Sequence, residues 1–223
     1  MGERANGDRK VEVAVATKLG ELEAMLGRFE SAREQITRAK ALARELGDLV
    51  SLTRALTDSA RVEMLADFPA AAEVEARASF EILEQMGNTG NLASTAPYLG
   101  DILYAQGGYD EAYELSVFTE RITMQGDVDA EVRWRFLRAK TLAQRGRHDE
   151  AERFALAAVD IAAPTDYLDL HADALDALAE VLRLADRNAD AAATLGEAIT
   201  LRRRKGNLVA AARAERMLAE LGP

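Results

Sequence analysis

Apolar side chains recur along this chain at intervals of three and four residues, as they do on one face of an α-helix. In one stretch they fall at Phe29, Ala32, Ile36, Ala39, Leu42 and Leu46. In a later stretch they fall at Leu175, Leu178, Ala179, Leu182 and Leu184. The sequence lacks the strict alternation of apolar and polar residues that marks a half-buried strand. The pattern therefore predicts an all-α protein.

One short phrase, in its clearest copies Gly-x-aromatic-x-x-Ala, occurs five times along the chain. Its closing alanines are Ala32, Ala71, Ala112, Ala151 and Ala191. The intervals between successive alanines are nearly equal, which gives a period of roughly 40 residues. A fixed period of this length is typical of proteins built from stacked helical hairpins, in which each hairpin buries its core against its neighbours.

A second kind of break, a glycine followed by Asp or Asn, recurs with the same period. It occurs as Gly47-Asp48, Gly87-Asn88, Gly126-Asp127 and Gly206-Asn207, and Pro164-Thr-Asp166 replaces it once. Glycine accepts the left-handed conformation that ends a helix, and an Asp or Asn side chain caps the next one. Each unit should therefore hold two helices. We predict a polar tail over residues 1–10, repeats over 11–47, 48–87, 88–126, 127–165 and 166–205, and a capping helix over 206–223.

The residues around these breaks resemble the tetratricopeptide repeat (TPR), which places Leu-Gly on its first helix and Gly-x-Tyr-x-x-Ala across its turn. Leu19-Gly20 and Leu99-Gly100 match the first part of that pattern. Asp58-Ser59 and Arg138-Ala139 depart from it, and the period exceeds the family's 34 residues by about six. The resemblance implies a right-handed α-solenoid of about five hairpins, in which the first helix of each hairpin lines a concave groove.

A narrower resemblance covers residues 90–221. Stretches such as Ala-Glu-Val-Leu-Arg-Leu-Ala at 179–185 are similar to the C-terminal TPR region of bacterial multidomain regulators that carry class III adenylate/guanylate cyclase and ATPase domains. This resemblance implies a regulatory or sensory part of a signalling protein. It does not imply cyclase activity, because the metal-binding aspartates of that family lie in an α/β domain and this sequence predicts no strands.

Charge and composition narrow the classes of partner. The formal net charge of -10 and the pI near 4.9 argue against general binding to nucleic acid, which rewards positive surfaces. No apolar run approaches the roughly 20 residues that a membrane helix needs. The absence of cysteine excludes disulfides, thiolate metal sites and cysteine nucleophiles. We therefore expect a cytoplasmic protein that binds neither nucleic acid nor membranes.

Motifs that carry chemistry are scarce. The sequence has no Gly-x-x-x-x-Gly-Lys-Ser/Thr loop for phosphates, and its two histidines, His148 and His171, lie far apart in different units. His148 takes the place of the Phe or Tyr of other units, which indicates a structural role. We predict no cofactor, no metal site and no enzymatic activity.

Two charged clusters allow more than one interpretation. The pairs Asp169/Asp173 and Asp173/Asp176 share a helix face and could hold a cation, although such pairs are usually only solvated. Residues 202–205, Arg-Arg-Arg-Lys, end a predicted helix, where cations in water complement the negative helix terminus. The alternative for this run is contact with an anionic partner.

Alignment of the repeats gives candidate residues for partner binding on the first helices. The inner positions are Glu21, Glu63, Asp101, Lys140 and Glu180. Their neighbours are Tyr98, Tyr104, Arg133, Trp134 and Phe136. This groove has mixed polarity and leans acidic, so it suits a basic or amphipathic peptide.

Three functions are compatible with these features. The first is a non-catalytic scaffold or regulatory module that binds a protein or peptide in the groove. The second is a sensor that encloses a small molecule or peptide, which an internal apolar pocket would favour. The third is an enzyme, which requires carboxylates of shifted pKa to converge in one cleft. Copies of the chain could also associate through the ends of the solenoid.

Overall fold

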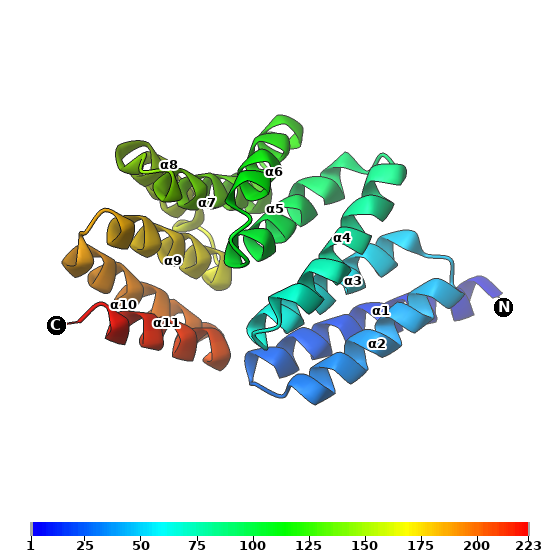
Figure 1. Cartoon of the computed structure of the whole chain (residues 1–223). Helices are drawn as coiled ribbons and strands as arrows, with labels where there is room; N and C mark the ends of the chain where they lie inside the picture. The colour runs from blue at the N-terminus through cyan, green and yellow to red at the C-terminus, as the bar shows by residue number, and fades with distance from the viewer. Residues whose placement is uncertain (1, 223) are drawn as a thin grey trace.

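The computed structural model describes residues 2–222, and over that range it consists of helices without strands (Figure 1). The helices are α1 (Gly2–Met25), α2 (Phe29–Glu45), α3 (Leu49–Leu65), α4 (Pro69–Gln85), α5 (Thr89–Ala105), α6 (Tyr109–Ile122), α7 (Val128–Gln144), α8 (His148–Ala162), α9 (Leu168–Leu184), α10 (Asn188–Lys205) and α11 (Leu208–Glu220). The first ten form five successive hairpins, and each hairpin packs on the next. The predicted all-α solenoid of TPR-like hairpins is confirmed.

The Gly-Asp and Gly-Asn breaks set where the first helix of a hairpin begins. Asp48, Asn88, Asp127 and Asn207 are the N-caps of α3, α5, α7 and α11, and each side chain accepts a hydrogen bond of 3.1–3.2 Å from the backbone N–H three residues later. The glycine before each cap has a positive φ, as at Gly47 with φ of 63°. These caps start α3, α5 and α7, the first helices of the three middle hairpins, in a common register, whereas α9 begins after Tyr167 without a side-chain cap.

The second hairpin corrects the repeat alignment by one residue. Ala71, which the sequence phrase aligns with Ala32, is exposed, and Ala72 is the buried residue at the crossing of α3 and α4. The reason is Pro69, which stands at the first position of α4, where a fixed φ and a missing N–H suit a helix start. The buried alanines are therefore Ala32, Ala72, Ala112, Ala151 and Ala191, and their spacing is more even than that of the sequence phrase.

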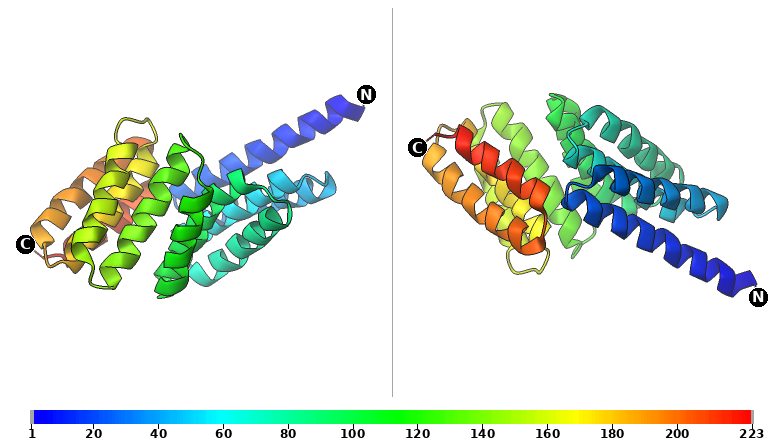
Figure 2. Two further views of the ribbon diagram at one scale, coloured as in Figure 1. Left: turned by 90° about the horizontal axis from the view of Figure 1, so that it is seen from above. Right: turned by 90° about the horizontal axis from the view of Figure 1, so that it is seen from below.

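The solenoid curves until its last helix returns to its first, as Figures 1 and 2 show. Helix α11 packs on α10, as expected of a cap, and also contacts α1. Arg213 of α11 donates a hydrogen bond of 2.8 Å to the Met64 carbonyl at the end of α3. A methyl group of Val209 lies beside Gly27, just after α1. The concave side is therefore bounded by the last helix as well as by the five hairpins.

The segment predicted as a polar tail forms the beginning of the first helix. Helix α1 begins at Gly2, so residues 2–10 are helical, and Met1 lies outside the described residues. Two ion pairs hold this segment to the body of the solenoid. Arg9 lies 2.5 Å from Glu45, and Lys10 lies 3.0 Å from Asp48.

Helix α1 leaves one apolar face uncovered. Val15 and Leu22 are 51% and 53% exposed. The equivalent positions are buried in all four later hairpins, at Ala55, Val62, Thr95, Ile102, Trp134, Thr141, Ala174 and Val181. In those hairpins a preceding hairpin supplies the cover, and α1 has no such neighbour among the described residues.

Self-association through a solenoid end stays a prediction, and this face of α1 is where we expect it. Wild-type protein should show a concentration-dependent mass in sedimentation equilibrium, and Val15→Glu should remove that dependence because a charge would be buried in the contact. Val74→Glu is the matched control, since Val74 is 70% exposed on α4. A wild-type mass that stays monomeric at every concentration would contradict the prediction.

Candidate ligand-binding cavity

The corrected register aligns one charged residue on the first helix of each hairpin. These residues, which we call the charged row, are Glu21, Arg61, Asp101, Lys140 and Glu180. They recur with the period of the hairpins, and their charges alternate in sign from one helix to the next. All five line a cavity of about 390 Å³ on the concave side. The solenoid thus brings equivalent positions of five units to one site.

Because the charges of the row alternate in sign, its side chains on neighbouring helices attract each other along the cavity wall. Arg61 Nη1 lies 3.0 Å from Glu21 Oε1, and Lys140 Nζ donates to Asp101 Oδ1 at 2.6 Å. Such charge-assisted contacts are stronger than hydrogen bonds between neutral groups. Glu180 accepts a hydrogen bond of 2.5 Å from the Tyr104 hydroxyl, so α5 is joined to α9 across the cavity.

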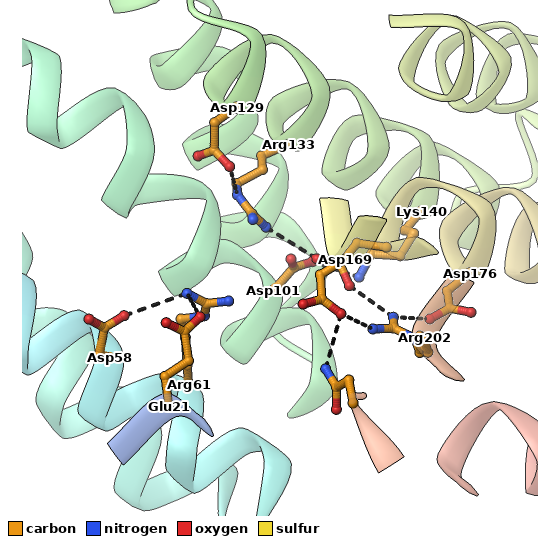
Figure 3. A network of polar contacts seen from close by, with 12 residues as sticks. Glu21, Asp58, Arg61, Asp101, Asp129, Arg133, Lys140, Asp169, Asp176 and Arg202 are labelled. Atoms are coloured by element: carbon orange, nitrogen blue, oxygen red, sulfur yellow. Dashed lines mark hydrogen bonds and ion pairs between the residues drawn. The ribbon is translucent and has the colours of Figure 1, made fainter. Parts of the chain in front are cut away.

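A second cluster joins α9 to α10 (Figure 3). Asp169, Asp173 and Asp176, which we call the α9 carboxylates, lie one turn apart on the cavity face of α9. Arg202 of α10 donates to Asp173 Oδ1 at 2.9 Å and to Asp176 Oδ2, and it lies 3.8 Å from Asp169. The interpretation of residues 202–205 as solvated cations is therefore wrong for Arg202, which is only 6% exposed. Residues 203–205 are exposed, so both interpretations of that part of the run stay open.

Tyr98 and Arg133 connect the two clusters. The Arg133 guanidinium stacks over the Tyr98 ring at 4.1 Å from its centroid, and Arg61 lies 5.3 Å from the same centroid. Arg133 also donates to Asp129 at 2.8 Å and lies 3.5 Å from Asp173. Burial raises the pKa of Tyr98 to about 12 even though both cations lower it, so the hydroxyl stays protonated.

The carboxylates of the cavity wall differ in how far nearby cations offset the effect of burial on their pKa values. Burial raises the pKa of Asp58, Asp101, Asp169 and Asp176 above the ordinary value, although each has a cation nearby that acts in the opposite direction. Burial acts in the same direction on Asp173, but Arg202 and Arg133 together outweigh it and lower its pKa. Most of these carboxylates are therefore less stable as anions here than in water.

One edge of the cavity is apolar. One turn beyond the charged row, the last turns of α1 and α3 contribute Met25, Met64 and Leu65. Ala105 ends α5 at the same level, and Met217 of α11 also lines the cavity. The cavity thus combines a charged centre with a flexible, methionine-rich edge, and methionine adapts readily to the shape of a bound group.

Eight of the ten predicted partner-binding residues line this cavity. They are Glu21, Tyr98, Asp101, Tyr104, Arg133, Phe136, Lys140 and Glu180. Their role in binding stays a prediction. The residues that the sequence analysis did not propose for the groove include Asp58, Arg61, Asp169, Asp173, Asp176, Arg202, Asn207 and Arg213.

Two predicted residues lie elsewhere. Glu63 pairs with Arg33 of α2 through hydrogen bonds of 2.8 and 2.7 Å, and the residue that aligns with Glu21 is Arg61. Trp134 is 5% exposed and points away from the cavity, with its ring edge-to-face on Phe154 of α8 at 5.9 Å. Both errors follow from assigning a residue to a groove-side helix without fixing which face of the helix it occupies.

We also searched the part of the chain that the structure describes for a metal site and for a membrane-spanning helix. There, no cluster of three or more His, Asp or Glu side chains has the arrangement of a metal site. The helices over the same range include none with the length and apolar character needed to cross a bilayer. Neither His148 nor His171 lines the cavity.

These observations define an all-α solenoid of TPR-like hairpins that closes around a charged cavity. No protein-family model matches the sequence, and no curated protein does. Solved structures do resemble it. The putative kinesin light chain TPR-like repeats of Podosopora anserina share 16% identity over 88% of this chain and 97% of theirs, with a TM-score of 0.60.

Two further solved structures resemble this chain with similar identities and TM-scores. A TPR protein of Thermus thermophilus shares 20% identity, with a TM-score of 0.61 over 91% of this chain and 98% of its own. A signal transduction ATPase with numerous domains and a TPR sensor, from Pyrococcus horikoshii, shares 14% identity, with a TM-score of 0.62 over 95% of this chain and 37% of its own. At these identities the likeness concerns the fold.

Proposed function

We propose that this chain is a non-catalytic recognition module that binds a peptide segment of a protein partner in its concave cavity. The observation that carries the proposal is the convergence of one charged residue from each of five hairpins on a single cavity of about 390 Å³. That volume lies in the range of about 300–1,000 Å³ typical of ligand sites. A solenoid that only needed to be stable would have no reason to line its inner face with buried charges.

The composition of the wall supports a binding role over a catalytic one. The residues that line the cavity include no His, Ser or Thr, so the usual nucleophile and general base are missing there. Its carboxylates have shifted pKa values, but burial accounts for the raised values and the ion pairs with Arg202 and Arg133 account for the lowered value of Asp173, and a structural network of buried ion pairs produces such shifts without catalysis.

Selection from a random peptide library tests this proposal. Peptides should be enriched on wild-type protein and lost on Ala105→Trp, because Ala105 is an exposed residue of the cavity edge and an indole there would fill the space. Ala193→Trp is the matched control, since Ala193 is exposed on α10 and does not line the cavity. Equal enrichment on wild type and Ala105→Trp would contradict binding in the cavity.

A second candidate is a sensor that encloses a small molecule, as the regulatory part of a larger cytoplasmic signalling protein. The observation that favours it is the return of α11 to α1 and α3, which turns an open groove into a bounded cavity. The resemblance of residues 90–221 to cyclase–ATPase regulators and the sensor named in the Pyrococcus horikoshii protein support the same context. A rise in melting temperature with a cyclic nucleotide, ATP or another metabolite, absent in Ala105→Trp, would favour this candidate.

A further inference from the structure

The cavity wall carries more negative than positive side chains. Its carboxylates are three from the charged row, the three α9 carboxylates and Asp58, whereas its cations are Arg61, Arg133, Lys140, Arg202 and Arg213. Two of these cations also pair with carboxylates outside the cavity, Arg133 with Asp129 and Arg213 with Asp67, whereas one wall carboxylate, Glu21, pairs with a cation outside it, Lys18. When all groups are ionised, the wall therefore has a negative surplus.

The cations of the wall are already engaged by protein groups. Arg202 lies between Asp173 and Asp176, Lys140 donates to Asp101, and Arg61 lies 3.0 Å from Glu21 and 3.5 Å from Asp58. An anionic ligand would have to break such pairs inside a partly buried site, which leaves uncompensated carboxylates behind. The wall is therefore poorly suited to an anionic ligand.

The carboxylates outnumber these cations, and two of them are incompletely satisfied, although Arg202 Nε in the same cluster is also buried without an acceptor among the described residues. Asp176 Oδ1 is buried and accepts no hydrogen bond from any of the described residues, although Oδ2 of the same carboxylate is bonded to Arg202. Within the described chain, Asp58 has only Arg61 at 3.5 Å as an ionic partner. A buried acceptor without a donor costs free energy, and a cationic group placed beside the exposed part of the Asp176 carboxylate, whose side chain is 25% exposed, offsets that cost through its charge.

We infer that the cavity takes a cationic group, an alkylammonium or a guanidinium, beside the α9 carboxylates, with the apolar part of the same ligand against Met25, Met64 and Met217. A lysine or arginine side chain flanked by apolar residues has this chemistry, and so does a free alkylamine. The inference rests on the proposed function, because it names the chemistry of the ligand that the same cavity would bind.

Two further features of the cavity agree with this assignment. Burial raises the pKa of Asp58, Asp101, Asp169 and Asp176, so these four anions would be stabilised by a cation brought into the cavity, whereas cations already lower the pKa of Glu21 and Asp173. The methionine edge lies one turn along the first helices from the charged row, which suits a ligand whose charge and apolar surface are close together.

Calorimetric titration with three capped tripeptides tests the charge class. The probes are Ac-Leu-Lys-Leu-NH₂, Ac-Leu-Gln-Leu-NH₂ and Ac-Leu-Glu-Leu-NH₂, with hexylamine and hexanol as the free-amine pair. We expect the Lys peptide to bind at least about tenfold more tightly than the Gln peptide, since a close charge pair contributes this much or more. The Glu peptide should not bind. Saturable binding of hexylamine but not hexanol would support a free amine as the source of the same chemistry.

Asp176→Asn provides the matched variant, because it removes one charge of the α9 carboxylates while keeping the side-chain shape. We expect it to weaken binding of the Lys peptide about tenfold and to lower the melting temperature less than Arg202→Met does, because Arg202 keeps its pair with Asp173 at 2.9 Å and burial disfavours the Asp176 anion. Asp190→Asn, at an exposed position of α10 outside the cavity, should change neither quantity.

The outcomes separate this inference from the proposed function. Equal binding of the Lys and Gln peptides, tighter binding of the Glu peptide, or an unchanged affinity in Asp176→Asn would overturn the cationic class. Library peptides that bind the cavity but contain no Lys or Arg would overturn it as well and leave the proposed function in place. If neither library peptides nor probes bind, both proposals are wrong.

Discussion

Arg202→Met should lower the free energy of unfolding by about 3 kcal/mol, the lower end of the range for removing one partner of a buried ion pair. The loss arises because Asp173 and Asp176 would keep their charges inside the cavity without the guanidinium that now lies between them. We choose the lower end because the side chains of these two aspartates are 31% and 25% exposed, so cavity water would partly solvate them. For a chain of this size the melting temperature should fall by about 6–12 °C.

Arg203→Met is the control, since it changes the same residue type one position along α10. The Arg203 side chain is 65% exposed and pairs with Glu215, so its removal should change stability by less than about 1 kcal/mol. Unfolding can be followed through Trp134, which is the only tryptophan and is buried outside the cavity. A loss of stability in Arg202→Met no larger than in Arg203→Met would contradict the role of Arg202.

The loss in free energy of unfolding caused by Arg202→Met should also depend on pH. In the wild type, Arg202 helps to lower the pKa of Asp173, so this carboxylate adds stability above its unfolded pKa near 4, and the contribution is lost as pH falls through its lower folded pKa. In the variant the unpaired carboxylates can take up protons at mildly acidic pH, which removes the uncompensated charge. The difference in free energy of unfolding between variant and wild type should therefore become smaller as the pH falls from 7 to 4. A difference independent of pH would indicate lost side-chain contacts instead.

The sequence predicts the architecture because the signals that end and start its helices are local. The caps Asp48, Asn88 and Asp127 act within three residues of their own position, so the starts of α3, α5 and α7 can be predicted without knowing what packs against them. Arg61, Asp101 and Lys140 follow these caps at the same interval, so an alignment on the caps places Arg61, and not Glu63, in the charged row. The sequence therefore contains the information that assigns this position correctly.

The Arg202 cluster could not be predicted in the same way. Asp173 and Asp176 are close in sequence, and their spacing predicts a shared helix face, but whether this face meets water or a cation depends on how α10 crosses α9. The return of α11 to α1 depends in turn on the curvature accumulated over five hairpins. Such long-range geometry arises from small differences in contacts between successive hairpins, which residue spacing does not encode.

Curvature is sensitive to how closely the first helices approach each other, and Gly100 fixes one such approach. A Cβ at this position of α5 would lie 2.3 Å from Leu137 Cδ2 and 3.4 Å from its Cγ. Leu137 of α7 is fully buried, so its side chain cannot move into free space. Gly100→Ala should therefore force α5 and α7 apart and lower the free energy of unfolding by about 1–3 kcal/mol, the usual cost of overpacking. Thermal and denaturant unfolding measure this effect.

A matched substitution and a double variant identify the cause. Gly196→Ala, inside α10 with no atom near the new Cβ, should raise stability by about 0.5–1 kcal/mol, because alanine is the better helix former. In a Leu137→Ala background the clash with the leucine methyl group is absent, so Gly100→Ala should no longer destabilise the protein, and the two effects should be strongly non-additive. If Gly100→Ala destabilises equally in both backgrounds, the contact with Leu137 is not the cause. If it stabilises the wild type as Gly196→Ala does, α5 and α7 do not approach closely enough to set the curvature that closes the cavity.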